Sequence, residues 1–169
     1  MRNFFEFFSL PTQFDVDPFA LDDAYHTLQR LVHPDRFVSA TEAQKRTAVQ
    51  YASLANDAYQ TLRNPLKRAK HLCALHGVRM DANAKMDPEF LMEQMEWREN
   101  LASAKETGDK KILGQMAEEQ AARYARQLAE LKVCLDDGRF DEAVSDINKL
   151  MFLERMGTEV KQALEGFPA

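Results

Sequence analysis

Apolar side chains recur every three or four residues along most of the chain, which is the spacing of one face of an α-helix. The first such segment begins at Asp17-Pro18, an N-cap followed by a ring that suits the first helical position. It ends at His33, because the residue before a proline is disfavoured in the helical region. The apolar positions predict one buried stripe, made of Leu21, Ala24, Tyr25, Leu28, Leu31 and Val32.

A second long helix is predicted to begin at Ser39, with Glu42 three residues later as the partner in a capping box. It is rich in alanine and ends before Pro65. A short helix over 66–76 follows and ends at Gly77, a residue type common just after a helix. Together with the Phe-rich start of the chain, these segments predict one helical unit over residues 1–77, built on a long antiparallel pair.

The second half of the chain repeats the same signals. Residues 78–86 carry few large apolar groups and no clear period, so we expect them to link two units. Asp87-Pro88 then begins a helix that ends at Gly108, and two more helices follow, separated by a break at Gly138. Three helices joined by short turns predict an antiparallel bundle over 87–169. The predicted fold class is therefore all-α, in two parts.

The amino-acid composition disfavours several classes of function. The 169 residues include 45% apolar and 29% charged side chains, which is ordinary for a globular protein. Lys and Arg number 22 against 27 Asp and Glu, a formal charge of −5, which disfavours a general nucleic-acid binder. No apolar run approaches the roughly 20 residues of a membrane span, and the start of the chain lacks the features of a signal peptide. We therefore expect a cytoplasmic protein that binds neither nucleic acid nor membrane.

Cysteine and histidine placement gives little support to a metal site. Cys73 and Cys134 show no CxxC spacing and are predicted to be two reduced thiols. His71 and His76 flank Cys73, but a structural zinc site needs further ligands nearby. We expect no metal and no cofactor.

The tripeptide His33-Pro34-Asp35 falls in the loop between the first two long helices. In the simplest interpretation, Pro34 only stops the helix between two polar residues. The alternative is a binding loop, because proline fixes φ and lowers the cost of ordering the loop. His33 then offers ring nitrogens, and Asp35 offers two oxygens that suit a bidentate arginine.

The sequence around this tripeptide resembles the J-domain, the module by which co-chaperones engage a DnaK-type chaperone ATPase. The resemblance covers about residues 1–75 and rests on Phe8-Ser9-Leu10-Pro11, Tyr25-x-x-Leu28, His33-Pro34-Asp35, Arg36-Phe37, Asn56-Asp57-Ala58-Tyr59 and Pro65-x-x-Arg68-Ala69. It implies that the tripeptide docks where the nucleotide domain of the chaperone meets its interdomain linker, favouring the state that hydrolyses ATP. Arg30 and Arg36 are candidates for supporting ionic contacts, or are simply solvated charges at helix ends.

Three features depart from the usual J-domain pattern. Arg36 stands where a lysine is frequent, which keeps the charge, and Ala55 stands where isoleucine is usual, which shrinks a core contact. The helix before the tripeptide is often strongly basic, whereas here Asp17, Asp22 and Asp23 accompany Arg30. This weakens charge steering toward a generic chaperone and indicates a dedicated partner.

The helix after the link has apolar residues on two sides. At about 100° per residue, the predicted core side holds Phe90, Trp97, Leu101 and Ala104. Leu91, Met92 and Met95 point elsewhere, and Phe152 likewise departs from the stripe of the last helix, formed by Phe140, Val144, Ile147 and Met151. Either Leu91 and Met95 widen the core, or this second side is kept for a partner. Met92 and Phe152 fit the first alternative poorly.

The run from Phe90 to Glu99, together with Lys149-Leu-Met-Phe-Leu153, resembles the HscB family of bacterial co-chaperones, and this resemblance spans the whole chain. It implies a protein that binds the iron–sulfur scaffold IscU with its C-terminal helices and delivers it to the chaperone HscA, whose ATPase it stimulates. The positions that match the scaffold-binding surface of the family are Leu91, Met92, Met95, Glu96, Arg98, Glu99 and Phe152. Met95 replaces a frequent leucine, which a flexible methionine should tolerate.

Other functions receive less support. His33 and Asp35 suggest an acid–base pair, but no nucleophile, phosphate-binding glycine loop or paired carboxylates accompany them, so we expect no enzyme activity. The closer alternative is a J-domain co-chaperone for a different client, or an adaptor that binds a second copy of itself. Eukaryotic relatives of the family carry an added cysteine-rich zinc segment at the N-terminus, and this sequence shows neither that segment nor a transit peptide, so we expect a bacterial cytoplasmic form. We also expect a monomer.

Overall fold

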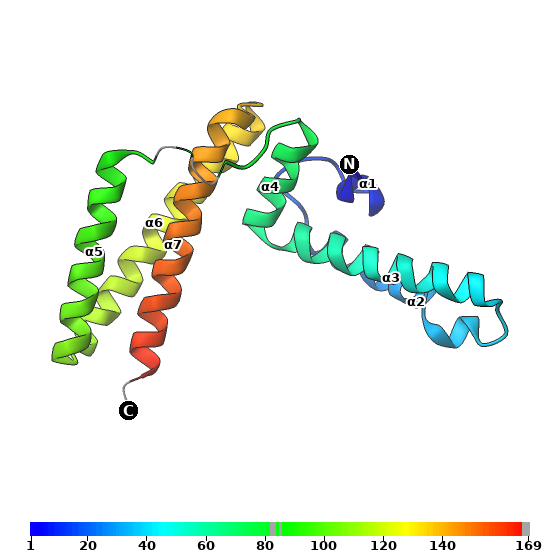
Figure 1. Cartoon of the computed structure of the whole chain (residues 1–169), viewed down its shortest axis with the longest axis horizontal. Helices are drawn as coiled ribbons and strands as arrows, with labels where there is room; N and C mark the ends of the chain where they lie inside the picture. Colours follow the sequence, from blue (N-terminus) through cyan, green and yellow to red (C-terminus); the bar gives the residue numbers. More distant parts are fainter. Residues whose placement is uncertain (82–83, 85, 167–169) are drawn as a thin grey trace. The chain divides into compact units, whose positions relative to one another are not determined.

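The computed structural model describes residues 1–81, 84 and 86–166, and the secondary structure in these residues is helical (Figure 1). The chain divides into two compact units, Met1–Arg79 and Met80–Ala169. Of the predicted link over 78–86, positions 82, 83 and 85 lie outside the described residues, and the others belong to no helix. The predicted all-α architecture, an antiparallel helical hairpin with short flanking helices followed by three long helices, is confirmed for the described residues.

The first unit is built on two long antiparallel helices with three short elements around them. Its elements are α1 (Phe4–Phe7), α2 (Pro18–Leu31), the 3₁₀ turn η1 (Pro34–Phe37), α3 (Glu42–Arg63) and α4 (Pro65–Leu75). In Figure 1, α2 and α3 lie side by side, and η1 follows the end of α2. The hairpin therefore presents the tripeptide at one of its ends.

Capping residues fix where the two long helices begin. The Asp17 side chain accepts a hydrogen bond of 2.9 Å from the Phe19 amide, as the sequence predicts. The predicted start of α3 at Ser39 is wrong, because Thr41 is the N-cap. The Thr41 hydroxyl accepts from the Gln44 amide at 3.2 Å, and the Gln44 side chain accepts from the Thr41 amide at 3.0 Å. A complete capping box two residues later outweighs the Ser39 pattern.

The core of the first unit is formed where α1, α2, α3 and α4 meet. The most deeply buried side chains include Phe5, Leu21, Ala55, Leu62 and Leu72. The prediction that Leu31 belongs to the buried stripe is wrong, since this residue is 51% exposed. Leu31 lies about 80° from Leu21 around the helix and in the last turn of α2, so it falls at the edge of the packed face.

His71 attaches the start of the chain to α4. Its Nε2 accepts a hydrogen bond from the Phe4 amide at 3.1 Å, and its ring stacks on the Phe4 ring at 4.5 Å between centroids. Burial lowers the pKa of His71 because the charged imidazolium would lose its water. His71 therefore has a structural role, and within the described ranges no three His, Cys, Asp or Glu side chains are grouped to hold a metal ion.

The second unit consists of α5 (Pro88–Thr107), α6 (Lys110–Asp136) and α7 (Phe140–Glu165). Gly108 and Gly138 follow α5 and α6 with φ of 66° and 75°, which a side chain disfavours, so glycine suits both turns. The α6–α7 pair is closely packed. The buried Gln120 amide donates to the Leu153 carbonyl at 2.6 Å, and a Cβ at Gly157 would lie 2.8 Å from Gln120 Nε2.

The core stripe of α7 differs slightly from its prediction. Val144 and Ile147 are buried as expected, whereas Phe140 and Met151 are only half-buried at the edge of the stripe. The buried positions continue along α7 through Leu150, Leu153, Met156 and Val160. The buried face of α7 therefore rotates slightly around the helix axis along its length. Its later turns bury positions that the first two turns do not indicate.

Candidate functional site

The tripeptide His33-Pro34-Asp35, here called the His-Pro-Asp turn, forms the start of η1. Pro34 takes the first position of the turn, and His33 is its N-cap. The Asp35 amide donates to His33 Nδ1 at 3.2 Å, so this ring nitrogen carries no proton. The neutral His33 ring therefore carries its proton on Nε2. The loop is held by its own residues, which lowers the cost of ordering it on binding.

The Asp35 carboxylate is available to a partner. Its side chain is 90% exposed, and its nearest cationic candidate is His33 Nδ1 at 3.5 Å. Because that nitrogen accepts from the Asp35 amide, the contact is not an ion pair. Both carboxylate oxygens remain accessible for a bidentate arginine from outside the molecule.

A hollow of about 820 Å³ borders the His-Pro-Asp turn. Arg30 and Arg36, the two predicted supporting residues, both line it. Arg30 also donates to the Thr27 hydroxyl at 3.3 Å, so its side chain is partly positioned. Sequence reasoning did not assign the other lining residues beyond the turn, which are His26, Gln29, Val32 and Ala52. The spacing of His26, Gln29 and Arg30 before His33 is that of one helix face and could have indicated them.

Tyr25 and Tyr59, two tyrosines of the J-domain-like sequence pattern, hold α2 and α3 together. The Tyr59 hydroxyl donates to Asp22 at 2.7 Å, and this hydrogen bond is the largest cause of the raised pKa of Tyr59. The Tyr25 and Tyr59 rings stack at 4.1 Å between centroids, and the Tyr25 hydroxyl donates to Asn56 at 3.4 Å. Asp22 is one of the acidic residues that distinguish α2 from the basic helix frequent in J-domains. Its hydrogen bond with Tyr59 gives it a structural role.

The side chains of α5 divide as the helical wheel predicts. Phe90, Trp97, Leu101 and Ala104 are all buried, which confirms the predicted core side. Leu91, Met92 and Met95 are 41%, 71% and 65% exposed. The alternative in which Leu91 and Met95 widen the core is therefore wrong, and α5 keeps a solvent-facing apolar side.

Phe152 of α7 lies between the exposed and the buried positions. It is half-buried, so the expectation that the bundle leaves it uncovered holds only in part. Its ring meets the Phe90 ring edge to face at 6.4 Å between centroids, and the Arg155 guanidinium lies 5.6 Å from its centroid. We call Leu91, Met92, Met95 and Phe152 the apolar patch. The predicted flanking charges Glu96, Arg98 and Glu99 are exposed.

Sequence reasoning missed the buried polar groups on the core side of α5. Gln94 is buried, and neither its side-chain Nε2 nor the Trp97 indole Nε1 has a hydrogen-bond acceptor among the described residues. The glutamine at 94 follows the buried Phe90 by one turn, so the helical wheel alone could have placed it on the core side.

In the part of the chain that the structure describes, no helix is long and apolar enough to cross a membrane.

Comparison with known proteins agrees with this two-part architecture. Residues 86–161 match the family model described as the HSCB C-terminal oligomerisation domain. A curated relative from Burkholderia thailandensis, described as a co-chaperone protein HscB homolog, is 47% identical over 167 residues, covering 95% of this chain and 93% of the relative. A second such homolog, from Burkholderia vietnamiensis, is 45% identical over 163 residues with the same coverage.

Solved structures give the same result. The chaperone HscB from Vibrio cholerae matches with a TM-score of 0.88 at 39% identity, covering 97% of this chain and 98% of that chain. The human co-chaperone protein HscB matches with a TM-score of 0.89 at 29% identity, covering 96% and 82%. A helical J-domain hairpin followed by a three-helix unit defines the class as a J-domain co-chaperone. The chain belongs to the HscB family of co-chaperones.

Proposed function

We propose that this co-chaperone binds the iron–sulfur scaffold IscU through its apolar patch and delivers it to the DnaK-type chaperone HscA, whose ATPase it stimulates through the His-Pro-Asp turn. The observation that carries the proposal is the apolar side of α5, where Met92 and Met95 stay exposed in a chain that also presents the Asp35 carboxylate. The two surfaces lie in different compact units. One molecule therefore has a separate surface for each partner.

The chaperone-binding role is assigned to His33, Pro34 and Asp35, with Arg30 and Arg36 as supporting contacts. Asp35 accepts a pair of hydrogen bonds from an arginine of the chaperone. Arg30 and Arg36 line the same hollow and make supporting contacts with acidic groups of the chaperone. Stimulation requires that the turn bind the ATP-hydrolysing state more tightly than the resting state, because only differential affinity shifts an equilibrium.

The scaffold-binding role is assigned to Leu91, Met92, Met95 and Phe152, with Glu96, Arg98 and Glu99 as flanking charges. Exposed methionines adapt their shape to an apolar partner surface, and central apolar anchors carry most of the free energy of binding at such interfaces. The charged residues around them steer the encounter and disfavour partners of the wrong charge.

We assign residues 1–77 to the J-domain, 78–86 to a linker and 87–169 to the scaffold-binding domain, and place the activity in the cytoplasm with the protein as a monomer. His33→Gln tests the separation of the two roles. This variant should lose stimulation of the HscA ATPase and keep its affinity for IscU in calorimetry. A variant that stimulates normally would reduce the tripeptide to a helix stop, and wild-type protein that gives no heat with folded IscU would reject the scaffold assignment.

Self-association through the apolar patch is a second candidate function, because the matching family model is described as an oligomerisation domain. Sedimentation equilibrium of the wild type and of Met92→Ala distinguishes the two functions. A monomer at all concentrations supports the scaffold assignment. A dimer that Met92→Ala dissociates supports self-association.

A further inference from the structure

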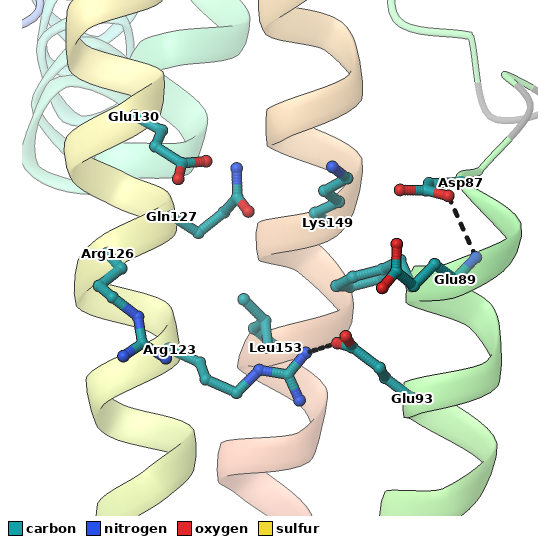
Figure 2. A pocket seen from close by; sticks show the side chains of 10 residues that line it. Asp87, Glu89, Glu93, Arg123, Arg126, Gln127, Glu130, Lys149 and Leu153 are labelled. Atoms are coloured by element: carbon teal, nitrogen blue, oxygen red, sulfur yellow. Dashed lines mark hydrogen bonds and ion pairs between the residues drawn. The ribbon is translucent and has the colours of Figure 1, made fainter.

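An open cleft of about 300 Å³ lies within the second unit, between the first turns of α5 and the α6–α7 pair (Figure 2). Its charges are divided by element: the α5 side supplies only carboxylates, and α6 and α7 supply all the cations and one more carboxylate. The charged lining residues are Asp87, Glu89, Glu93, Arg123, Arg126, Glu130 and Lys149. A small ion of either sign would meet like charges here, so the cleft fits an internal electrostatic contact better than a ligand site.

Two residues of α5 that line this cleft, one helical turn apart, contact the other two helices. Glu93 forms an ion pair with Arg123 of α6, drawn as a dashed line in Figure 2. Phe90 meets the Phe152 ring of α7, and the Lys149 ammonium lies 5.8 Å from the centroid of the Phe90 ring. The start of α5 is thus attached to α6 by charge and to α7 by ring contacts.

The attachment of α5 to α6 and α7 matters because the core side of α5 buries two polar groups. Gln94 and Trp97 bury side-chain N–H groups without acceptors among the described residues, and each such group opposes docking of the helix. Phe90 borders the cleft, whose other lining residues are mostly charged or polar. The Glu93–Arg123 ion pair therefore provides a directional contact next to these two buried N–H groups.

We propose that Glu93 and Arg123 are positioning residues for the apolar patch. Their ion pair fixes the start of α5 against α6, and this sets Leu91, Met92 and Met95 relative to Phe152, which belongs to α7. A partner that contacts both helices binds tightly only when their relative position is already fixed. The inference rests on the proposed function of the patch, but neither Glu93 nor Arg123 needs to touch the scaffold.

Charge reversal with a compensating swap tests this role in the full-length protein. Arg123→Glu places two carboxylates opposite each other and should weaken IscU binding by about five- to tenfold in calorimetry. It should also speed hydrogen exchange of the amides over residues 90–97 several-fold, with or without IscU. Adding Glu93→Arg to Arg123→Glu restores an ion pair of opposite polarity and should return both readouts to within about twofold of wild type.

Arg126→Glu is the matched control, because it makes the same charge change in the same cleft. It should leave IscU affinity and hydrogen exchange within about twofold of wild type, so general charge effects on association cancel in the comparison. Weakened binding without faster exchange, and without rescue by the swap, would show direct contact with the scaffold and overturn the inference. Faster exchange with unchanged IscU affinity would also overturn it, while loss of binding in Met92→Ala would still support the proposed function. If wild-type protein binds no IscU, the proposed function fails and the inference falls with it.

Discussion

The His-Pro-Asp turn presents one carboxylate on a short loop that its own residues hold, whereas the apolar patch spreads four side chains over two helices. The turn is fixed locally by Pro34 and by the hydrogen bond from the Asp35 amide to His33. The patch depends on how α5 and α7 pack together, since the Phe152 ring of α7 contacts the Phe90 ring of α5. We therefore expect the loss of the single Asp35 carboxylate to remove nearly all binding at the turn. Each substitution in the apolar patch should remove only part of the free energy of binding there.

The two units also differ in charge. Residues 1–79 carry 10 Lys and Arg against 8 Asp and Glu, whereas residues 80–169 carry 12 against 19. The acidic excess of the chain therefore belongs to the unit that carries the apolar patch. If this unit binds the scaffold as we propose, electrostatic attraction favours a basic surface on the scaffold and a rate of association that falls as salt is added.

The largest effect is expected for Asp35→Asn. Removing the carboxylate charge leaves the arginine of the chaperone without its partner, which should reduce the affinity for the ATP-hydrolysing state by about 2–5 kcal/mol. The side chain is almost fully exposed, so the melting temperature should stay unchanged. The HscA ATPase rate measures the first expectation and calorimetric unfolding the second. Stimulation at the wild-type level by this variant would contradict the role of the turn.

Met92→Ala should give the next largest effect and should act only on the other surface. Loss of an exposed apolar anchor is expected to weaken IscU binding by about 1–3 kcal/mol with no change in the free energy of unfolding. Phe152→Ala should weaken binding by a similar amount and also lower stability, because its ring packs on Phe90. Isothermal calorimetry with IscU measures both variants. Val133→Ala, an exposed apolar residue outside the patch, is the control and should bind normally.

Thr41→Ala separates the stability of the hairpin from the chemistry of the turn. Loss of the capping box should lower the free energy of unfolding by about 1 kcal/mol, measured by denaturant titration. Affinity for IscU should not change, because the cap lies in the first unit. Ser39→Ala is the matched control and should leave stability nearly unchanged. An equal loss in both variants would contradict the assignment of Thr41 as the N-cap.

The smallest effect is expected from His71 and depends on pH. Burial lowers its pKa in the folded state below the ordinary value of 6.5, so the unfolded chain binds the proton more tightly. The stabilising contribution of neutral His71 is present above pH 6.5 and is lost as the pH falls from there through the folded-state pKa. One proton limits this slope to about 1.4 kcal/mol per pH unit. His71→Gln should remove this part of the pH dependence, as followed by urea unfolding between pH 5 and 8.

Local signals allowed most of the fold to be predicted from the sequence. The pairs Asp17-Pro18 and Asp87-Pro88 start α2 and α5 as expected, because a cap acts on neighbouring backbone groups. Ser39 was the wrong cap because two overlapping patterns compete there and only three-dimensional context decides between them. Leu31 was wrongly placed in the core because periodicity does not show where the neighbouring helix stops covering α2.

The candidate surfaces were predictable to different degrees. The exposed side of α5 could be predicted from the helical wheel. Phe90 and Trp97 lie on the core side of that helix, and Met92 falls nearly opposite Phe90. The cleft with Glu93 and Arg123 could not be predicted, because these residues are 30 positions apart and meet only through the packing of α5 on α6. Likewise, the hollow beside the turn takes Ala52 from α3, whose register against α2 is set by tertiary contacts.

The most direct test of the central claim measures the HscA ATPase rate with this protein and IscU added separately and together. If one molecule engages both partners at once, the rate with both should exceed the sum of the two separate increments. Asp35→Asn should then abolish the combined increment, and Met92→Ala should shift it to higher IscU concentration. A combined rate no greater than that sum, or one that Asp35→Asn leaves intact, would contradict the account.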